Sequence, residues 1–410
     1  MSAAASTLSL SISAVPLTSK GSGSREISRK NSNGMPSPYW QIFAPNSSKN
    51  GPKYACRQAI GSQFPLCAAA YWFTVQELPM CYSAMVRSDY AKFVREYGAK
   101  LSLKNFYELF YRRLGDSSIL IPKSVEAAFE MPQSEAERDI KMAIAQYAAD
   151  REKELLADLE TQRARLAKAT AKLQVKFTKT AAADQRIATK KIPWYEEKIA
   201  KLHQTRLSAI DSRIFPGSYV PVMVMEYGER VLKLMRYHCR PSHVPESFDK
   251  EFPGCYNARK DSLKGFWRHQ YGKTHGVIVI SRFYEHVPRH LAEGRQSLQP
   301  GEKPGTVVVE FWPEPEQDLV LACVWARWTA PGVPDLLSFA IITDDPPPEV
   351  RAVGHDRCVV PIRPKDIDTW LQPEQSTYEQ LDAILDPSAR PYFRHALLTG
   401  ETPDAEEQES

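Results

Sequence analysis

The sequence predicts an α+β protein in which a strand-rich half follows a helical half. Residues 133–210 are rich in Ala, Glu, Lys, Arg and Leu at helical spacing, whereas short apolar runs separated by turn residues follow Ile210. We therefore expect a curved or barrel-like mixed β-sheet core with flanking helices. The 133–210 segment is expected to be inserted into that core as an antiparallel helical or coiled-coil hairpin.

Length and composition are those of a globular protein. The chain has 410 residues, 43% of them hydrophobic and 25% charged, with a net charge of +4. This charge is too small to indicate a nucleic-acid partner by itself. The seven cysteines show neither CxxC nor His/Cys metal spacing, so we expect a reducing cytoplasm, no metal and no cofactor. No apolar run is long enough to span a membrane, which predicts a soluble, cytoplasmic protein.

The first 79 residues lack a folding pattern. Thirteen of the first fifty are serine, which is typical of a disordered segment. We expect residues 1–79 to be a disordered leader, as a mis-assigned start or a removed propeptide. The folded domain would then cover 80–385. Within it, apolar and aromatic residues over 89–113 recur at helical spacing and predict two amphipathic helices.

The 133–210 hairpin has its own start signals. Ser134 and Glu137 form a capping-box pattern at the beginning of the first helix, and Pro193 stands where a second helix can begin. Three leucines recur every seven residues, as in a coiled-coil seam: Leu159, Leu166 and Leu173. Its charges are read first as a solvated face and second as a surface for DNA, a protein partner or self-association.

The strand-rich half contains five apolar runs. They lie at 219–225, 276–280, 306–311, 319–328 and 336–343. A last helix is expected from about Ser376 to Leu385, where Asp386-Pro387 stops it. Residues 386–410 are expected to form a C-terminal segment with an acidic, disordered tail.

Cations and aromatic residues alternate after Cys255. The sequence Asn257-Ala258-Arg259 is followed within ten residues by Lys264, Trp267 and Arg268. Cations that follow phosphates and rings that stack on bases are typical of single-stranded nucleic-acid surfaces. The plainer alternative is a solvated basic loop with core aromatics.

Two further motifs offer acid–base chemistry. Glu285 lies between aromatic residues at the expected end of a strand, where burial favours its protonated form. His355, which can carry protons near neutral pH, precedes Arg357, a candidate phosphate ligand. Taken alone, each residue is more often explained by an ordinary structural role.

The order of these motifs is more informative than any one of them. Met80-Cys81, Asn257-Ala258-Arg259, Phe283-x-Glu285 and His355-Asp356-Arg357 occur in the order seen in the SRAP family, the SOS response-associated peptidases. From Cys81 to about Leu371 the chain resembles this family. The resemblance implies an SRAP-like fold, covalent capture of abasic sites in single-stranded DNA and hence association with the nucleoid.

The resemblance also implies roles for single residues. The catalytic residues that it implies are Cys81, Asn257, Glu285 and His355, and the supporting residue is Thr343. We expect the DNA surface to combine two family arginines with the basic block: Arg259, Arg357, Lys264, Trp267 and Arg268. The sequence departs from the family at Tyr82-Ser83, where Gly-Arg is usual, and at His286, where Trp is usual.

The chemistry requires Cys81 to be the first residue of the mature chain. Only then does its α-amine stand beside its thiol, so that both can condense with the aldehyde of an abasic site into a thiazolidine. Autoproteolytic removal of the leader and an AP-lyase side reaction would use the same residues. Two alternatives stay open: a thiol peptidase acting on other proteins, and a non-catalytic DNA-binding or coiled-coil adaptor.

Overall fold

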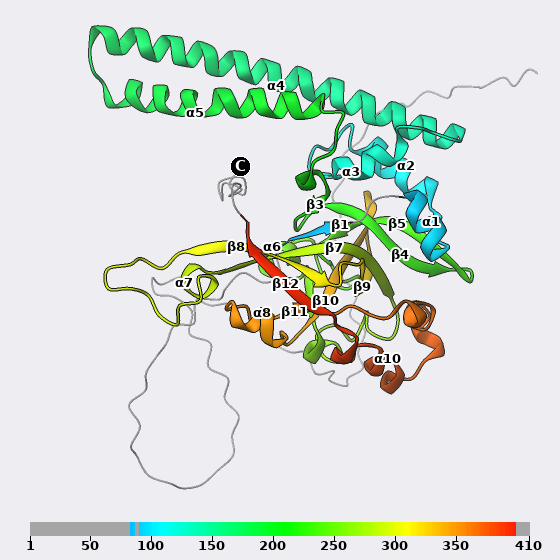
Figure 1. The fold of residues 1–410 in the computed structure, drawn as a ribbon. Coiled ribbons are helices and arrows are strands. Elements are labelled where there is room, and N and C mark those ends of the chain that lie inside the picture. Colours follow the sequence, from blue (N-terminus) through cyan, green and yellow to red (C-terminus); the bar gives the residue numbers. More distant parts are fainter. Residues whose placement is uncertain (1–82, 87–89, 399–410) are drawn as a thin grey trace, which may run out of the picture. The chain divides into compact units, whose positions relative to one another are not determined.

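The computed structural model describes residues 83–86 and 90–398, all within one unit, Thr74–Ser410. The expectations for the 1–79 leader, for Met80-Cys81 and for the acidic tail beyond 398 lie outside the described residues. In the described part, a large mixed sheet is accompanied by helices, as the α+β prediction requires (Figure 1). Among these residues, no helix combines the length and apolar character needed to cross a bilayer.

The sheet contains twelve strands within the described residues. They are β1 (Ser83–Val86), β2 (Lys100–Leu101), β3 (Arg213–Ile214), β4 (Tyr219–Glu226), β5 (Glu229–Tyr237), β6 (Asn257–Arg259), β7 (His275–Pro288), β8 (Thr306–Glu314), β9 (Leu319–Ala330), β10 (Val333–Asp344), β11 (Cys358–Val359) and β12 (Tyr392–Leu397). The main path is β11-β10-β5-β4-β7-β1-β3, and β9 pairs with both β7 and β10. Closure of this mixed sheet into a barrel stays a prediction.

Helices surround the sheet. They are α1 (Tyr90–Tyr97), α2 (Leu103–Arg112), α3 (Lys123–Glu126), α4 (Glu135–Val175), α5 (Lys179–Leu202), α6 (Phe248–Glu251), α7 (Arg289–Ala292), α8 (Pro348–Ala352), α9 (Ile367–Leu371) and α10 (Tyr378–Ile384). Short 3-10 turns lie at Ala127–Phe129, Ala209–Ser212, Lys260–Ser262, Pro364–Asp366, Pro373–Gln375 and Pro387–Ala389. The two helices expected over 89–113 are observed as α1 and α2.

The sheet is buried on both faces. Ile341 and Ile342, neighbours in β10, belong to two different hydrophobic clusters because successive side chains of a strand point to opposite faces. The strands also approach closely at Gly276 of β7. A Cβ there would lie 2.9 Å from Val222 Cγ1 and 3.1 Å from Cys323 Sγ, so this crossing requires glycine.

Helices α4 and α5 lie side by side as a hairpin (Figure 1). Ser134 caps α4 by accepting a hydrogen bond from the Glu137 N–H at 3.2 Å. The expectation that Pro193 begins the second helix is wrong: α5 begins at Lys179, capped by Thr178, and contains Pro193 in its interior. Pairing with α4 maintains this helix across the proline, which alone would favour an end. At its base, α4 buries Ile140 in the cluster formed with α2.

The C-terminal part differs from the prediction in two ways. Helix α10 is capped by Thr377, whose side chain accepts from Gln380, rather than by Ser376. The domain boundary expected at 385 is too early, because β12 pairs with β8 from Tyr392↔Glu314 to Leu397↔Val309. Short edge strands such as β12 owe their structure to a distant partner, so the local pattern did not reveal it.

Candidate active site

Strand β7 carries Glu285 into the interior. The sequence placed the strand end near Ile280, but β7 continues to Pro288, so the motif around Glu285 is part of the sheet. Glu285 pairs with Val309 of β8 and is 0% exposed. A carboxyl group in such a position needs a specific partner.

The partner is His355, which is positioned by a turn at Gly354. Its φ of +92° turns the chain out of α8, and a Cβ at this position would lie 2.5 Å from Leu291 Cδ1. Only glycine combines this backbone conformation with this space. The turn places the His355 side chain in the interior, where it is 0% exposed.

Glu285 and His355 form a buried pair. His355 Nε2 lies 3.1 Å from Glu285 Oε2, and His355 Nδ1 lies 2.9 Å from the Arg357 carbonyl oxygen. Because a carbonyl can only accept, Nδ1 carries a proton and donates it to Arg357. Nε2, the ring nitrogen beside Glu285, is therefore the one that can exchange a proton with the carboxyl group. This arrangement can take up or release one proton without solvent.

Asn257, Arg259 and Thr343 meet on two adjacent strands. Strands β6 and β10 are parallel there, with Asn257 opposite Ile341 and Thr343 opposite Arg259. Asn257 is 7% exposed and Thr343 0%. Tyr256 and Ile341 beside them, and Phe283 near Glu285, belong to the same hydrophobic cluster. Both groups of predicted site residues thus lie around one core.

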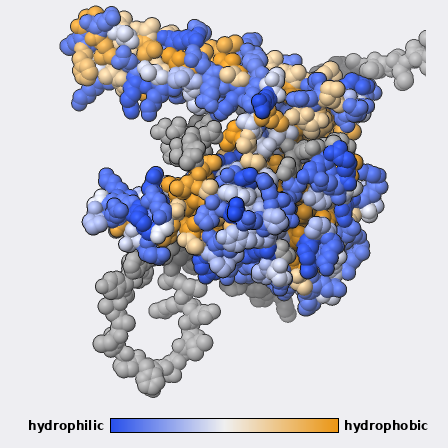
Figure 2. Space-filling view, in the orientation of Figure 1, coloured by the Kyte–Doolittle hydropathy of each residue, from blue (hydrophilic) through white to orange (hydrophobic). Residues whose placement is uncertain are grey.

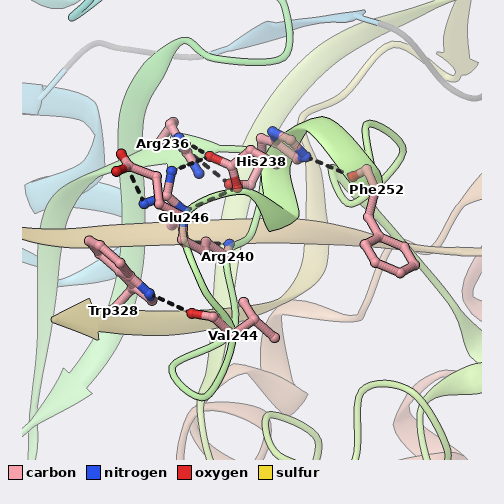
Figure 3. A network of polar contacts seen from close by, with 9 residues as sticks. Arg236, His238, Arg240, Val244, Glu246, Phe252 and Trp328 are labelled. Atoms are coloured by element: carbon pink, nitrogen blue, oxygen red, sulfur yellow. Dashed lines mark hydrogen bonds and ion pairs between the residues drawn. The ribbon is translucent and has the colours of Figure 1, made fainter. Parts of the chain in front are cut away.

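The loop between β5 and β6 is held by charge (Figure 3). Asp249 accepts a hydrogen bond from Arg236 at 2.8 Å and from Arg240 Nε at 3.1 Å. Burial alone would raise the pKa of Asp249, but the hydrogen bonds from Arg240 and Arg236 outweigh it and lower this pKa overall. Farther along, the Cys239 N–H donates to the Cys255 carbonyl at 2.9 Å, two residues before Asn257. This network fixes the approach to Asn257.

The predicted DNA-contacting cations already have acidic neighbours. Arg259 pairs with Asp261 at 2.7 Å and Asp345 at 3.1 Å. Lys264 pairs with Asp382 at 2.7 Å, and Arg357 lies 3.7 Å from Asp356. A DNA phosphate would exchange with these carboxylates rather than meet a bare cation.

One member of the basic block lies in the core rather than at the surface. Arg268 is exposed and donates to the Gly265 carbonyl at 3.1 Å. Trp267, in contrast, is 2% exposed and packs in the core with Leu263 and Trp370, so its expected role in base stacking is corrected to a packing role. Sequence spacing alone does not distinguish a ring that faces solvent from one that faces the core.

The start of β1 brings in residues that the sequence did not indicate. Ser83 pairs with Tyr284, the neighbour of Glu285. Arg213 of β3 donates to Ser83 Oγ at 2.9 Å and lies 4.1 Å from the Tyr284 ring centre. Burial lowers the pKa of His286, and the positive charges of Arg213 and His355 lower it further. No sequence pattern indicated Arg213, because it lies 130 residues from Ser83 along the chain.

Metal ligation has no obvious place in this part of the chain. In the described ranges, no group of three or more His, Cys, Asp and Glu side chains is arranged to hold an ion.

Comparison with known proteins adds one result for the family and several for structures. A family model described as SOS response associated peptidase (SRAP) matches residues 164–397. No curated protein is significantly similar in sequence. Similar solved structures include a protein from Bacteroides thetaiotaomicron, with 15% identity, a TM-score of 0.38 and coverage of 48% of this chain and 82% of that one.

Two others are from Bordetella bronchiseptica. One has 17% identity and a TM-score of 0.36, and the match covers 48% of this chain and 89% of that one. The other, a phage-related protein, has 18% identity and a TM-score of 0.34, with coverage of 46% and 82%. The family match extends over more than half of the 410 residues. The chain is therefore a member of the SRAP family, which places it in the context of the SOS response to DNA damage.

Proposed function

We propose that this protein captures abasic sites in single-stranded DNA by forming a thiazolidine with Cys81. The observation that supports this most is the buried Glu285–His355 pair, with 3.1 Å between Nε2 and Oε2. Such a pair supplies the proton transfers that imine formation needs, and it lies one residue along β7 from Tyr284, the partner of Ser83. Cys81 itself lies outside the described residues.

Chain length constrains where Cys81 acts. Cys81 is two positions before Ser83, and an extended chain spans at most about 7 Å over that length. Ser83 is fixed by its pairing with Tyr284 and by the hydrogen bond from Arg213. The α-amine and thiol would therefore act close to the first residue of β1, beside the strand that carries Glu285.

The proposed reaction balances without any other reagent. The neutral α-amine of Cys81 attacks the aldehyde carbon of the ring-opened sugar, and the carbinolamine loses water to give an imine. The thiol then adds to the same carbon and transfers its proton to the imine nitrogen, which closes the thiazolidine. An α-amine titrates near pH 8, so about a tenth is neutral at pH 7. Glu285 and His355 would deliver and remove the protons of the dehydration step.

The other site residues would position the DNA. Asn257, with Thr343 beside it, would orient the sugar. Arg259 and Arg357 would hold flanking phosphates, and Lys264 and Arg268 would follow the backbone farther away. Because Glu285 and His355 are closed from solvent, the proposal requires the pair to be uncovered when DNA binds.

The described cysteines do not compete with Cys81. Cys239, Cys255, Cys323 and Cys358 are all buried. Burial raises the pKa of each thiol well above its ordinary value, to about 12 for Cys255. They remain protonated at neutral pH, and a protonated thiol is a poor nucleophile. Covalent capture by this protein should therefore depend on Cys81.

Intact-mass measurement and a denaturing gel test the proposal together. The native protein should have a mass that begins at Cys81, and it should form a denaturation-resistant product with an abasic single-stranded oligonucleotide. Cys81→Ala and an oligonucleotide with all bases present are the controls, and neither should give the product. A mature chain beginning at Met1 or Ser2, or a product formed by Cys81→Ala, would overturn the proposal.

The same experiment addresses the other candidate activities. Cleavage of the oligonucleotide beside the trapped product would indicate an AP-lyase side reaction by β-elimination from the imine. Cleavage of a peptide by a chain that forms no DNA product would favour the thiol peptidase. Salt-sensitive DNA binding with neither reaction would favour the adaptor.

A further inference from the structure

The outer part of the hairpin is strongly basic. We call residues 161–192, which include the end of α4 and the beginning of α5, the distal segment. It contains nine lysines and arginines and a single acidic residue, Asp184. The preceding part of α4, residues 135–160, contains eight acidic and four basic residues. Charge is therefore divided along the hairpin, which a merely solvating helix surface does not require.

Most of these cations have no acidic partner. Arg163 pairs with Glu160 and Glu196, and Arg165 pairs with Asp184. No ion pair with any described residue is formed by the other seven, all of them exposed: Lys168, Lys172, Lys176, Lys179, Arg186, Lys190 and Lys191. Their mutual repulsion is reduced only by solvent and salt, which favours an anionic partner.

The apolar residues of the hairpin are mostly used inside it. Ala169 of α4 and Ala181 and Ala188 of α5 are at most 3% exposed. Figure 2 shows hydrophilic residues interspersed with hydrophobic ones along the visible surface of the hairpin. Exposed large apolar side chains of the distal segment gather at the turn, where Val175 is 89% and Phe177 71% exposed. A helix that binds in a membrane surface needs a broad apolar face. The distal segment is instead suited to a polyanion.

We propose that the distal segment binds the phosphate backbone of double-stranded DNA. Lys168 and Lys172 are four residues apart, so they lie on one face of α4 with a rise of about 6 Å between them, and Lys176 follows directly after the last residue of the helix. A row of lysines on a straight helix contacts phosphates without reading sequence. The binding is therefore non-specific and depends strongly on salt. It would hold the protein on duplex DNA beside a single-stranded lesion.

A matched pair of variants tests this surface. The first replaces Lys168, Lys172, Lys176 and Lys190 by glutamine, which is a good helix former. The control replaces four exposed lysines elsewhere by glutamine: Lys153, Lys250, Lys303 and Lys365. Binding of a fluorescent duplex with all bases present is measured by anisotropy over a range of salt concentrations, and circular dichroism checks helix content.

The distal variant should bind at least about tenfold more weakly at low salt, and the slope of log K against log salt should fall by about 3 to 4. The control should keep the wild-type slope. Equal slopes for all three proteins would overturn the inference, as would distal-lysine-dependent binding to phosphatidylserine vesicles without binding to the duplex. The duplex carries no abasic site, so its result is independent of covalent capture. Capture is read separately, on a short abasic single strand that the distal variant should still trap.

Discussion

Replacing Asp249 by asparagine tests whether the loop between β5 and β6 is held by charge. Asp249 is the common acceptor for Arg236 and Arg240. Its side chain is 17% exposed, and those of the two arginines are 16% and 6% exposed. Asparagine keeps the size of the side chain but removes its charge. Two nearly buried guanidinium groups would then face a neutral amide.

The structure sets the expected size of the effect. Removing one partner of a buried ion pair lowers the free energy of unfolding by about 3–5 kcal/mol. Because Asp249 keeps some contact with solvent, we expect about 3 kcal/mol, which lowers the Tm by about 6 °C in a domain of this size. The pKa of Asp249 is lower in the folded protein, so its contribution is present above the unfolded value of about 4 and is lost as pH falls through the folded value. The free energy of unfolding of the wild-type protein should therefore fall to that of the Asp249→Asn variant only at acidic pH.

Urea unfolding followed by tryptophan fluorescence measures this difference. Asp335→Asn is the matched control, because its ion pair with Arg327 is 41% and 65% exposed and should contribute at most about 1 kcal/mol. Capture of an abasic oligonucleotide by Asp249→Asn should also slow down, since the loop positions Asn257. Equal unfolding midpoints for the two variants would refute the view that the buried network stabilises this loop.

Three further substitutions test the two buried histidines and Glu285. Glu285→Gln should slow capture about 10²- to 10⁴-fold, and adding His355→Ala should change the rate little further because the two act as a unit; additive losses in single-turnover gels would contradict this. His275 donates from Nδ1 to the Trp370 carbonyl at 3.0 Å and accepts from the Gly272 N–H at 2.8 Å, and burial lowers its pKa to about 3. The unfolded state takes up a proton near pH 6.5, so the free energy of unfolding should fall by about 2 kcal/mol between pH 6.5 and 5, and urea curves of His275→Gln should lack that component.

The sequence determined the features that depend on neighbouring residues. The start of α4 follows from Ser134 and Glu137, which are close enough to form the cap without help from the rest of the chain. The apolar runs of β4, β9 and β10 were recognisable because a strand buried on both faces is apolar throughout. The order of the short motifs also predicted the family, which the match over 164–397 confirmed.

Only the tertiary structure decided which distant side chains meet. Glu285 and His355 are seventy residues apart, and their contact depends on the extension of β7 and on the turn at Gly354. Trp267 proved to be a core residue because it is buried in a cluster to which α9 and α10 also contribute, and β12 became a strand because β8 pairs with it. Burial and pairing of this kind are properties of the whole chain, since they depend on what packs against a residue rather than on the residues beside it.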